Sequence, residues 1–66
     1  MNVRKLKGKM VEKGVNVESL ACKMGIYRST LYRKLNDSEK ITIGDALKIK
    51  TALQLTDEEA KDIFFG

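Results

Sequence analysis

The chain has 66 residues, a net charge of +4, one cysteine (Cys22) and no histidine. At this length we expect a single domain over residues 1–66 that buries only about 60% of its unfolded surface and is therefore marginally stable. The composition excludes an internal disulfide and a cysteine–histidine zinc cluster, and no apolar run approaches the ~20 residues that span a bilayer. We expect a soluble cytoplasmic protein with no metal, no cofactor and no contact with a membrane.

Apolar residues at helical spacing predict a first helix over about residues 3–13. Val3, Leu6 and Met10 form its buried face, and Gly14 follows its last turn. A second helix is predicted over about residues 17–24.

The second helix has the features needed for a close crossing with its successor. Asn16 is a good N-cap, and Leu20 and Met24 contribute to an apolar stripe. Ala21 is small enough for another helix to cross close over it. Gly25 suits the left-handed residue that ends a helix without a Cβ penalty.

A third helix is predicted over about residues 28–35. Leu31 and Leu35 supply its buried face, one helical turn apart. Tyr27, at its entrance, is not a capping residue. The segment 17–36 therefore has the pattern of a helix-turn-helix, with polar side chains on the free sides of its second helix.

Two further helices follow a loop after residue 36. Thr42 and Asp45 resemble a capping box that opens a helix to about Leu53. Its predicted buried stripe holds Ala46, Ile49 and Leu53, widened by Ile43 and Leu47. Thr56 and Glu59 form a full capping box that opens a last helix to about Phe64. The predicted fold is all-α, a compact bundle of about five short helices.

Several of these residues resemble a known family, the lambda-repressor-like, Cro-like helix-turn-helix regulators of phages and bacteria. The matching residues are Leu20-Ala21, Gly25, Arg28-Ser29-Thr30-Leu31 and Leu35-Asn36. The flanking segments have the lengths of the family's first, fourth and fifth helices, so the resemblance covers nearly the whole chain. It implies the five-helix fold of the lambda-repressor DNA-binding domain and binding to operator DNA.

The resemblance makes the helix at 28–35 the recognition helix, which lies in the major groove of DNA. The residues that we expect to contact base edges are Arg28, Ser29, Tyr32 and Arg33. Arginine binds the O6 and N7 atoms of guanine in a bidentate manner, so we expect a guanine in each half-site. The alternative is that these are ordinary solvated side chains, and the ring of Tyr32 could instead cover the edge of the core.

A second group of residues is expected to contact phosphates, namely Asn36, Lys40, Lys34 and Tyr27. Asn36 matches a phosphate-contacting position of the family, although asparagine also suits the left-handed conformation after a helix. The ring of Tyr27 could instead cover the core. Lys34 stands at a position that is usually apolar, and its stem could lie along the core edge.

The charge distribution agrees with a DNA-facing first half. Residues 1–36 hold nine cationic and two acidic residues, a net charge of +7, whereas residues 37–66 hold four cationic and seven acidic residues, a net charge of −3. One departure from the family pattern is Val17, which stands where many relatives carry a glutamine that reaches phosphate and braces the recognition helix. We expect this brace to be missing.

We expect a sequence-specific transcriptional regulator, a repressor or a Cro-like protein. It would bind a partly palindromic double-stranded operator as a homodimer, with half-sites about 34 Å apart. Phe64 continues an apolar stripe and is expected in the core, whereas Phe65 points elsewhere, and the two are the candidate dimer-interface residues.

No catalytic constellation is present in the sequence, so we expect no enzyme activity and no small-molecule ligand. The alternative function is a protein-interaction module, such as an antirepressor or an antitoxin-like partner, that keeps the fold without reading an operator.

Overall fold

The computed structural model describes residues 1–65 and has only helices over that range. They are α1 (Val3–Glu12), α2 (Val17–Met24), α3 (Arg28–Asn36), the short 3-10 helix η1 (Ser38–Lys40), α4 (Ile43–Leu53) and α5 (Asp57–Phe65). The prediction of an all-α fold with five helices is confirmed. The short helix η1 lies in the segment that the sequence predicted as a loop.

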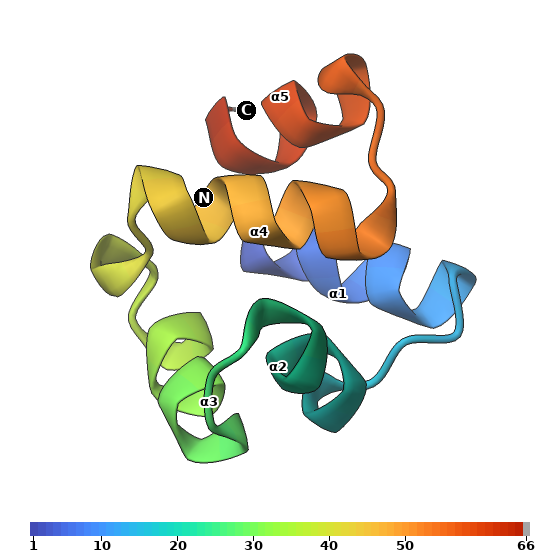
Figure 1. Ribbon diagram of the computed structural model, residues 1–66. Coiled ribbons are helices and arrows are strands. Elements are labelled where there is room, and N and C mark those ends of the chain that lie inside the picture. The colour runs from blue at the N-terminus through green and yellow to red at the C-terminus, as the bar shows by residue number, and fades with distance from the viewer. Residues whose placement is uncertain (66) are drawn as a thin grey trace.

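The helix-turn-helix lies at one end of the molecule. Figure 1 shows α2 and α3 at the bottom, α5 at the top, and α1 and α4 between them. Helix α2 packs against both α3 and α4, and α1 packs against α5. Helix α3 therefore lies at the end of the molecule away from the C-terminal helix.

The N-terminal caps that the sequence predicted for α2 and α5 are present in the structure. The Oδ1 atom of Asn16 accepts a hydrogen bond from the backbone N–H of Ser19 at 2.7 Å. Thr56 and Glu59 exchange reciprocal hydrogen bonds of 3.0 and 3.1 Å at the start of α5. Tyr27, which precedes α3, makes no side-chain capping bond. The start of α3 is therefore set by the turn before it and by packing.

Gly25 makes that turn short. Its φ angle is +73°, a left-handed conformation that glycine adopts without a steric penalty. The backbone N–H of Ile26 donates back to the carbonyl of Ala21 at 3.0 Å, which closes the end of α2. This turn fixes the angle at which α3 leaves α2.

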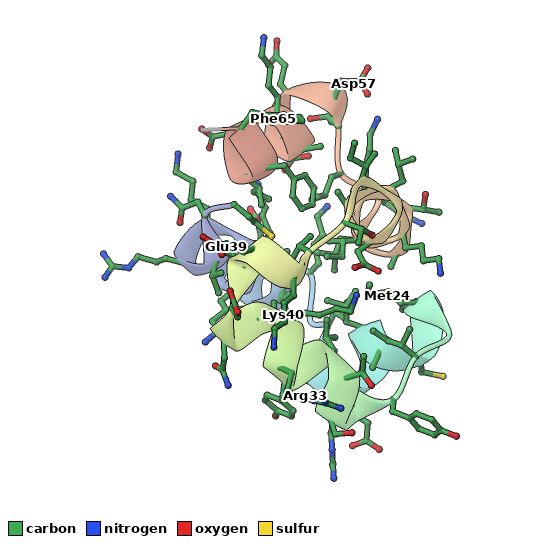
Figure 2. All side chains as sticks on the ribbon, turned by 90° about the vertical axis from the view of Figure 1, so that its left-hand side faces the viewer. Met24, Arg33, Glu39, Lys40, Asp57 and Phe65 are labelled. Carbon is green, nitrogen blue, oxygen red and sulfur yellow. The ribbon has the colours of Figure 1, made fainter. Side chains whose placement is uncertain are left out.

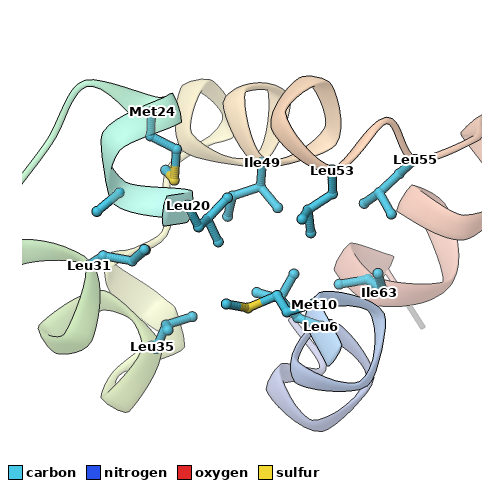
Figure 3. Packing of buried hydrophobic residues seen from close by; sticks show 11 residues of the cluster. Leu6, Met10, Leu20, Met24, Leu31, Leu35, Ile49, Leu53, Leu55 and Ile63 are labelled. Atoms are coloured by element: carbon cyan, nitrogen blue, oxygen red, sulfur yellow. The ribbon is translucent and has the colours of Figure 1, made fainter. Parts of the chain in front are cut away.

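One hydrophobic core joins all five helices. The buried apolar residues are Leu6, Met10, Leu20, Ala21, Met24, Leu31, Leu35, Ile49, Leu53, Leu55 and Ile63. Figure 3 shows their side chains converging from the surrounding helices. The predicted core faces of α1, α2 and α3 are confirmed. The buried Leu55, in the link between α4 and α5, was not predicted.

The prediction that Ile43 and Leu47 widen the buried face of α4 is wrong. Ile43 and Leu47 are 82% and 60% exposed, whereas Asp45, Ile49 and Leu53 are buried. At 100° per residue, Ile43 and Leu47 lie roughly 120° and 160° around the helix from Ile49. The face that contacts the rest of the bundle therefore excludes both of them.

Candidate nucleic-acid interface

Helix α3 is anchored by one face and free on the others. Leu31 and Leu35 are 0% and 6% exposed and fix the helix against the core. The four predicted base-contacting residues, Arg28, Ser29, Tyr32 and Arg33, are all exposed. The burial of one face thus leaves their side chains free to meet a ligand.

The two tyrosines do not cover the core. Tyr27 is 81% exposed and Tyr32 is 49% exposed, so each offers part of its ring and its hydroxyl to the solvent side. Tyr32 also lines a groove of about 530 Å³ that runs along the start of α2 and the end of α1. Both rings are accessible to a ligand that covers α3.

A basic hollow lies beside α3. Thr30, Arg33, Lys34 and Lys40 line a shallow depression of about 240 Å³ between α3 and η1. Figure 2 shows Arg33 and Lys40 on the same part of the molecule. Three cations and a hydroxyl around one hollow are suited to bind a phosphate group.

Asn36 and Lys40 are both exposed, at the ends of α3 and η1. Asn36 is the last residue of α3 and does not have a positive φ angle, so it is not the left-handed residue of a turn. Both side chains are free to contact a ligand on the side where α3 leads into η1.

Lys34 is paired inside the protein. Its Nζ atom lies 2.5 Å from Oδ2 of Asp45, and the two side chains are 20% and 10% exposed. The same carboxylate oxygen accepts the backbone N–H of Thr42 at 3.1 Å, within the predicted capping box of α4. A phosphate contact by Lys34 would therefore compete with an ion pair that joins α3 to α4.

The pKa of Asp45 reflects two opposing effects. Burial raises the pKa of this carboxyl, but the hydrogen bonds from Lys34 and Thr42 outweigh burial and lower the pKa below its ordinary value. Asp45 is therefore ionised at neutral pH, which keeps the ion pair with Lys34 intact. Sequence reasoning placed Asp45 in the capping box but missed this ion pair, because residues 34 and 45 belong to different helices.

Arg28 has an acidic neighbour that the sequence also did not reveal. Its Nη1 atom lies 3.6 Å from Oε2 of Glu18, which stands in the first turn of α2. The two side chains are 63% and 76% exposed. The crossing of the two helices brings these residues together, and no spacing rule within one helix predicts the contact.

Two of the basic residues of α1 form ion pairs with α5. Lys5 pairs with Asp62 at 2.7 Å, and Lys9 pairs with Glu59 at 2.5 Å. The pairing directs part of the positive charge of the first helix toward the acidic C-terminal helix. Two of the cations of α1 are therefore partly neutralised by α5.

The far end of the molecule carries an apolar surface. Phe64 packs in part against the core, as predicted, and Phe65 is 86% exposed. Both phenylalanines line a groove of about 400 Å³ between α4 and α5, together with Ile43 and Leu47. We call these four residues the α4–α5 apolar face. Figure 2 shows Phe65 at the end of the molecule opposite Arg33.

Residues 1–65 contain no group of three or more potential metal ligands. In the same part of the chain, none of the helices has the length and apolar character needed to cross a membrane.

Comparison with known proteins gives one match. The family model for the Cro/C1-type HTH DNA-binding domain matches residues 5–60, which include all of α2, α3 and α4. Searches of curated proteins and of solved structures found no match.

Proposed function

This chain belongs to the family of Cro/C1-type helix-turn-helix DNA-binding domains, and we propose that it regulates transcription by binding a partly palindromic operator as a homodimer. The observation that carries the proposal is the exposed polar side of α3, which continues into the basic hollow beside it. A helix anchored in this way is suited to enter the major groove, with a neighbouring surface that attracts phosphate.

In this proposal the first turns of α3 read bases. Arg28 and Arg33 each present a guanidinium to the groove floor, where guanine offers the O6 and N7 acceptors. Ser29 and Tyr32 stand on the same exposed side and contact neighbouring base edges or a thymine methyl group. Each half-site therefore contains a guanine that Arg28 recognises.

The proposed phosphate contacts flank this surface. Asn36 and Lys40 hold the DNA backbone at the end of α3, and the hydroxyl of Tyr27 contacts it at the other end. Lys34 also lines the hollow, and its contact with a phosphate would compete with its ion pair to Asp45. These contacts set the register of α3 and carry no sequence information themselves.

The proposed dimer forms through the α4–α5 apolar face. Its exposed members are apolar side chains on α4 and α5, and Phe65 lies at the end of the molecule away from Arg33. A two-fold contact between two such faces would leave both recognition helices free for successive major grooves, about 34 Å apart.

The experiment that tests the proposed function is selection of binding sequences from a random duplex pool, followed by titration at two salt concentrations. We expect a partly palindromic motif with a guanine in each half. The Arg28→Ala variant should lose preference at one base pair, while Lys40→Ala should weaken all sequences alike and reduce the salt slope by about 1.

Arg4→Ala is the matched control, because it removes the same charge from the first turn of α1. That turn adjoins α5, since the backbone N–H of Asn2 donates to the carbonyl of Ile63 at 2.7 Å. If no motif emerges and Arg28→Ala weakens binding no more than Arg4→Ala, operator recognition is wrong. The protein-interaction module would then be the better function, with the α4–α5 apolar face as its contact surface.

A further inference from the structure

Glu18 is an unusual charge for its place in the chain. It is the only acidic residue between residues 13 and 36, a stretch that holds five lysines and arginines. Its carboxylate lies 3.6 Å from the guanidinium of Arg28, at the junction of α2 with α3. A carboxylate on a surface that faces DNA repels phosphates and so reduces overall affinity.

Stability alone does not account for this pair. Both side chains are more than half exposed, and ion pairs of this kind add little to the stability of a fold. Glu18 does stand in the first turn of α2, where the helix dipole favours an acidic residue. That effect requires a carboxylate near the helix start, but it does not require one in contact with Arg28.

We propose that Glu18 is a positioning residue that holds the guanidinium of Arg28 for base reading; the inference rests on the proposed function. A guanidinium carries five N–H donors in one plane, so one edge can face a carboxylate while another edge meets the O6 and N7 atoms of guanine. Burial under DNA lowers the local dielectric and strengthens the Glu18–Arg28 attraction.

Glu18 also separates specific from non-specific binding. Without Glu18, Arg28 could reach any phosphate near the start of α3, whereas the adjacent carboxylate disfavours a phosphate at that point. The pair thus supports α3 where Val17 offers no polar side chain to brace it. The expected consequence is weaker binding to random DNA and stronger discrimination at one base pair.

The test measures the affinity of four proteins (wild type, Glu18→Gln, Arg28→Ala and the double variant) for three duplexes. The duplexes are the selected operator, the operator with the Arg28-dependent guanine replaced, and a random sequence. Arg28→Ala should reduce discrimination at that base pair by about 5- to 100-fold. Glu18→Gln should reduce discrimination at the same base pair by about 3- to 10-fold and raise the affinity for random DNA.

The double variant should discriminate no less than Arg28→Ala alone, because Glu18 acts through Arg28. Glu58→Gln is the matched control. Glu58 is exposed and holds the second position of α5, as Glu18 holds the second position of α2, so both changes remove the same interaction with a helix dipole. Glu58→Gln should leave discrimination unchanged. Thermal unfolding of each variant checks that it is folded.

Two results overturn the inference while the proposed function stands. Discrimination at the Arg28-dependent base pair that is unchanged in Glu18→Gln shows that the carboxylate does not position Arg28. A loss of preference at a different base pair shows that Glu18 reads a base itself, for example by accepting from the N4 amino group of cytosine. If Arg28→Ala also leaves every preference unchanged, Arg28 reads no base, and its assignment to a guanine in the proposed function fails along with the inference.

Discussion

The ion pair of Lys34 with Asp45 ties α3 to α4 through two side chains that are largely removed from solvent. Removing one partner leaves the other charge unpaired and largely removed from solvent, which costs more than breaking a surface pair. Asp45 also accepts the backbone N–H of Thr42, so its loss opens the capping box of α4. One residue therefore supports both the fold and the placement of α3.

We predict that Asp45→Ala lowers the free energy of unfolding by about 2–3 kcal/mol, from the lost cap and the unpaired lysine. Asp57→Ala is the control, because Asp57 is exposed and its ion pair with Lys50 lies at the surface. This control should change stability by less than about 1 kcal/mol. Chemical denaturation of both variants measures the difference, and equal losses would contradict the structural role of Asp45.

The ion pair of Lys9 with Glu59 predicts how stability depends on pH. The hydrogen bond from Lys9, with that from the backbone of Thr56, lowers the pKa of Glu59 from 4.5 to about 2. Its contribution to stability is therefore present above pH 4.5 and is lost as the pH falls toward 2. The hydrogen bonds to Glu59 and Glu12 raise the pKa of Lys9 above 10.5, so its contribution is present below pH 10.5 and is lost above the raised value.

Denaturation of the wild type between pH 2 and pH 6 should show this acid loss, and Glu59→Gln should reduce its slope between pH 4.5 and pH 2. Other carboxylates, such as Asp45, contribute to the remaining slope because their pKa values are also lowered. An identical acid slope in Glu59→Gln and the wild type would contradict the assignment.

At the scale of helices, the ends were predictable because they depend on local chemistry. Asn16, Thr42 and Thr56 each cap a helix within three residues of themselves, and Gly25 ends one. The orientation of α4 was not predictable in full. Its apolar residues spread around more than half of the helix, so the sequence allowed two inward faces. Packing against α2, together with the Lys34–Asp45 ion pair, selects one of them.

Two glycine-to-alanine substitutions test whether local backbone chemistry sets the helices and their ends, because they should change stability in opposite directions. Gly8 is exposed within α1, and a Cβ atom there would meet no other atom within 4 Å, so Gly8→Ala should stabilise the protein by about 0.5–1 kcal/mol. Gly25 has a φ angle of +73°, so Gly25→Ala should destabilise it by about 1 kcal/mol and disturb the placement of α3. Thermal unfolding measures both; a stabilising Gly25→Ala would contradict the left-handed turn.

At the scale of the whole molecule, the helices that carry the two proposed surfaces lie at opposite ends, α3 at one and α5 at the other. The sequence predicted the proposed members of the α3 surface and two of the four residues of the α4–α5 apolar face, because exposed polar residues and a terminal pair of aromatic residues are visible in the pattern. It did not predict that Ile43 and Leu47 extend the apolar surface, since this depends on the rotation of α4. Contacts between helices, such as that of Glu18 with Arg28, were likewise hidden.

We predict that Phe65→Ser weakens self-association at least tenfold and changes the stability of the monomer by less than about 0.5 kcal/mol, because the side chain is 86% exposed. Val11→Ser is the control, since Val11 is 82% exposed on α1 and lies outside the α4–α5 apolar face. Sedimentation equilibrium over a range of protein concentrations measures the association. Equal effects of the two substitutions would place the dimer contact elsewhere.

The most direct test of the central claim, that α3 reads bases in the major groove, uses a modified operator. Replacing the guanine assigned to Arg28 by 7-deazaguanine removes the N7 acceptor and leaves Watson–Crick pairing intact. We expect this operator to bind the wild type about 5- to 100-fold more weakly than the natural one, and the Arg28→Ala variant to bind both equally. Equal binding of both operators by the wild type, or the same loss in both proteins, would contradict base reading by Arg28.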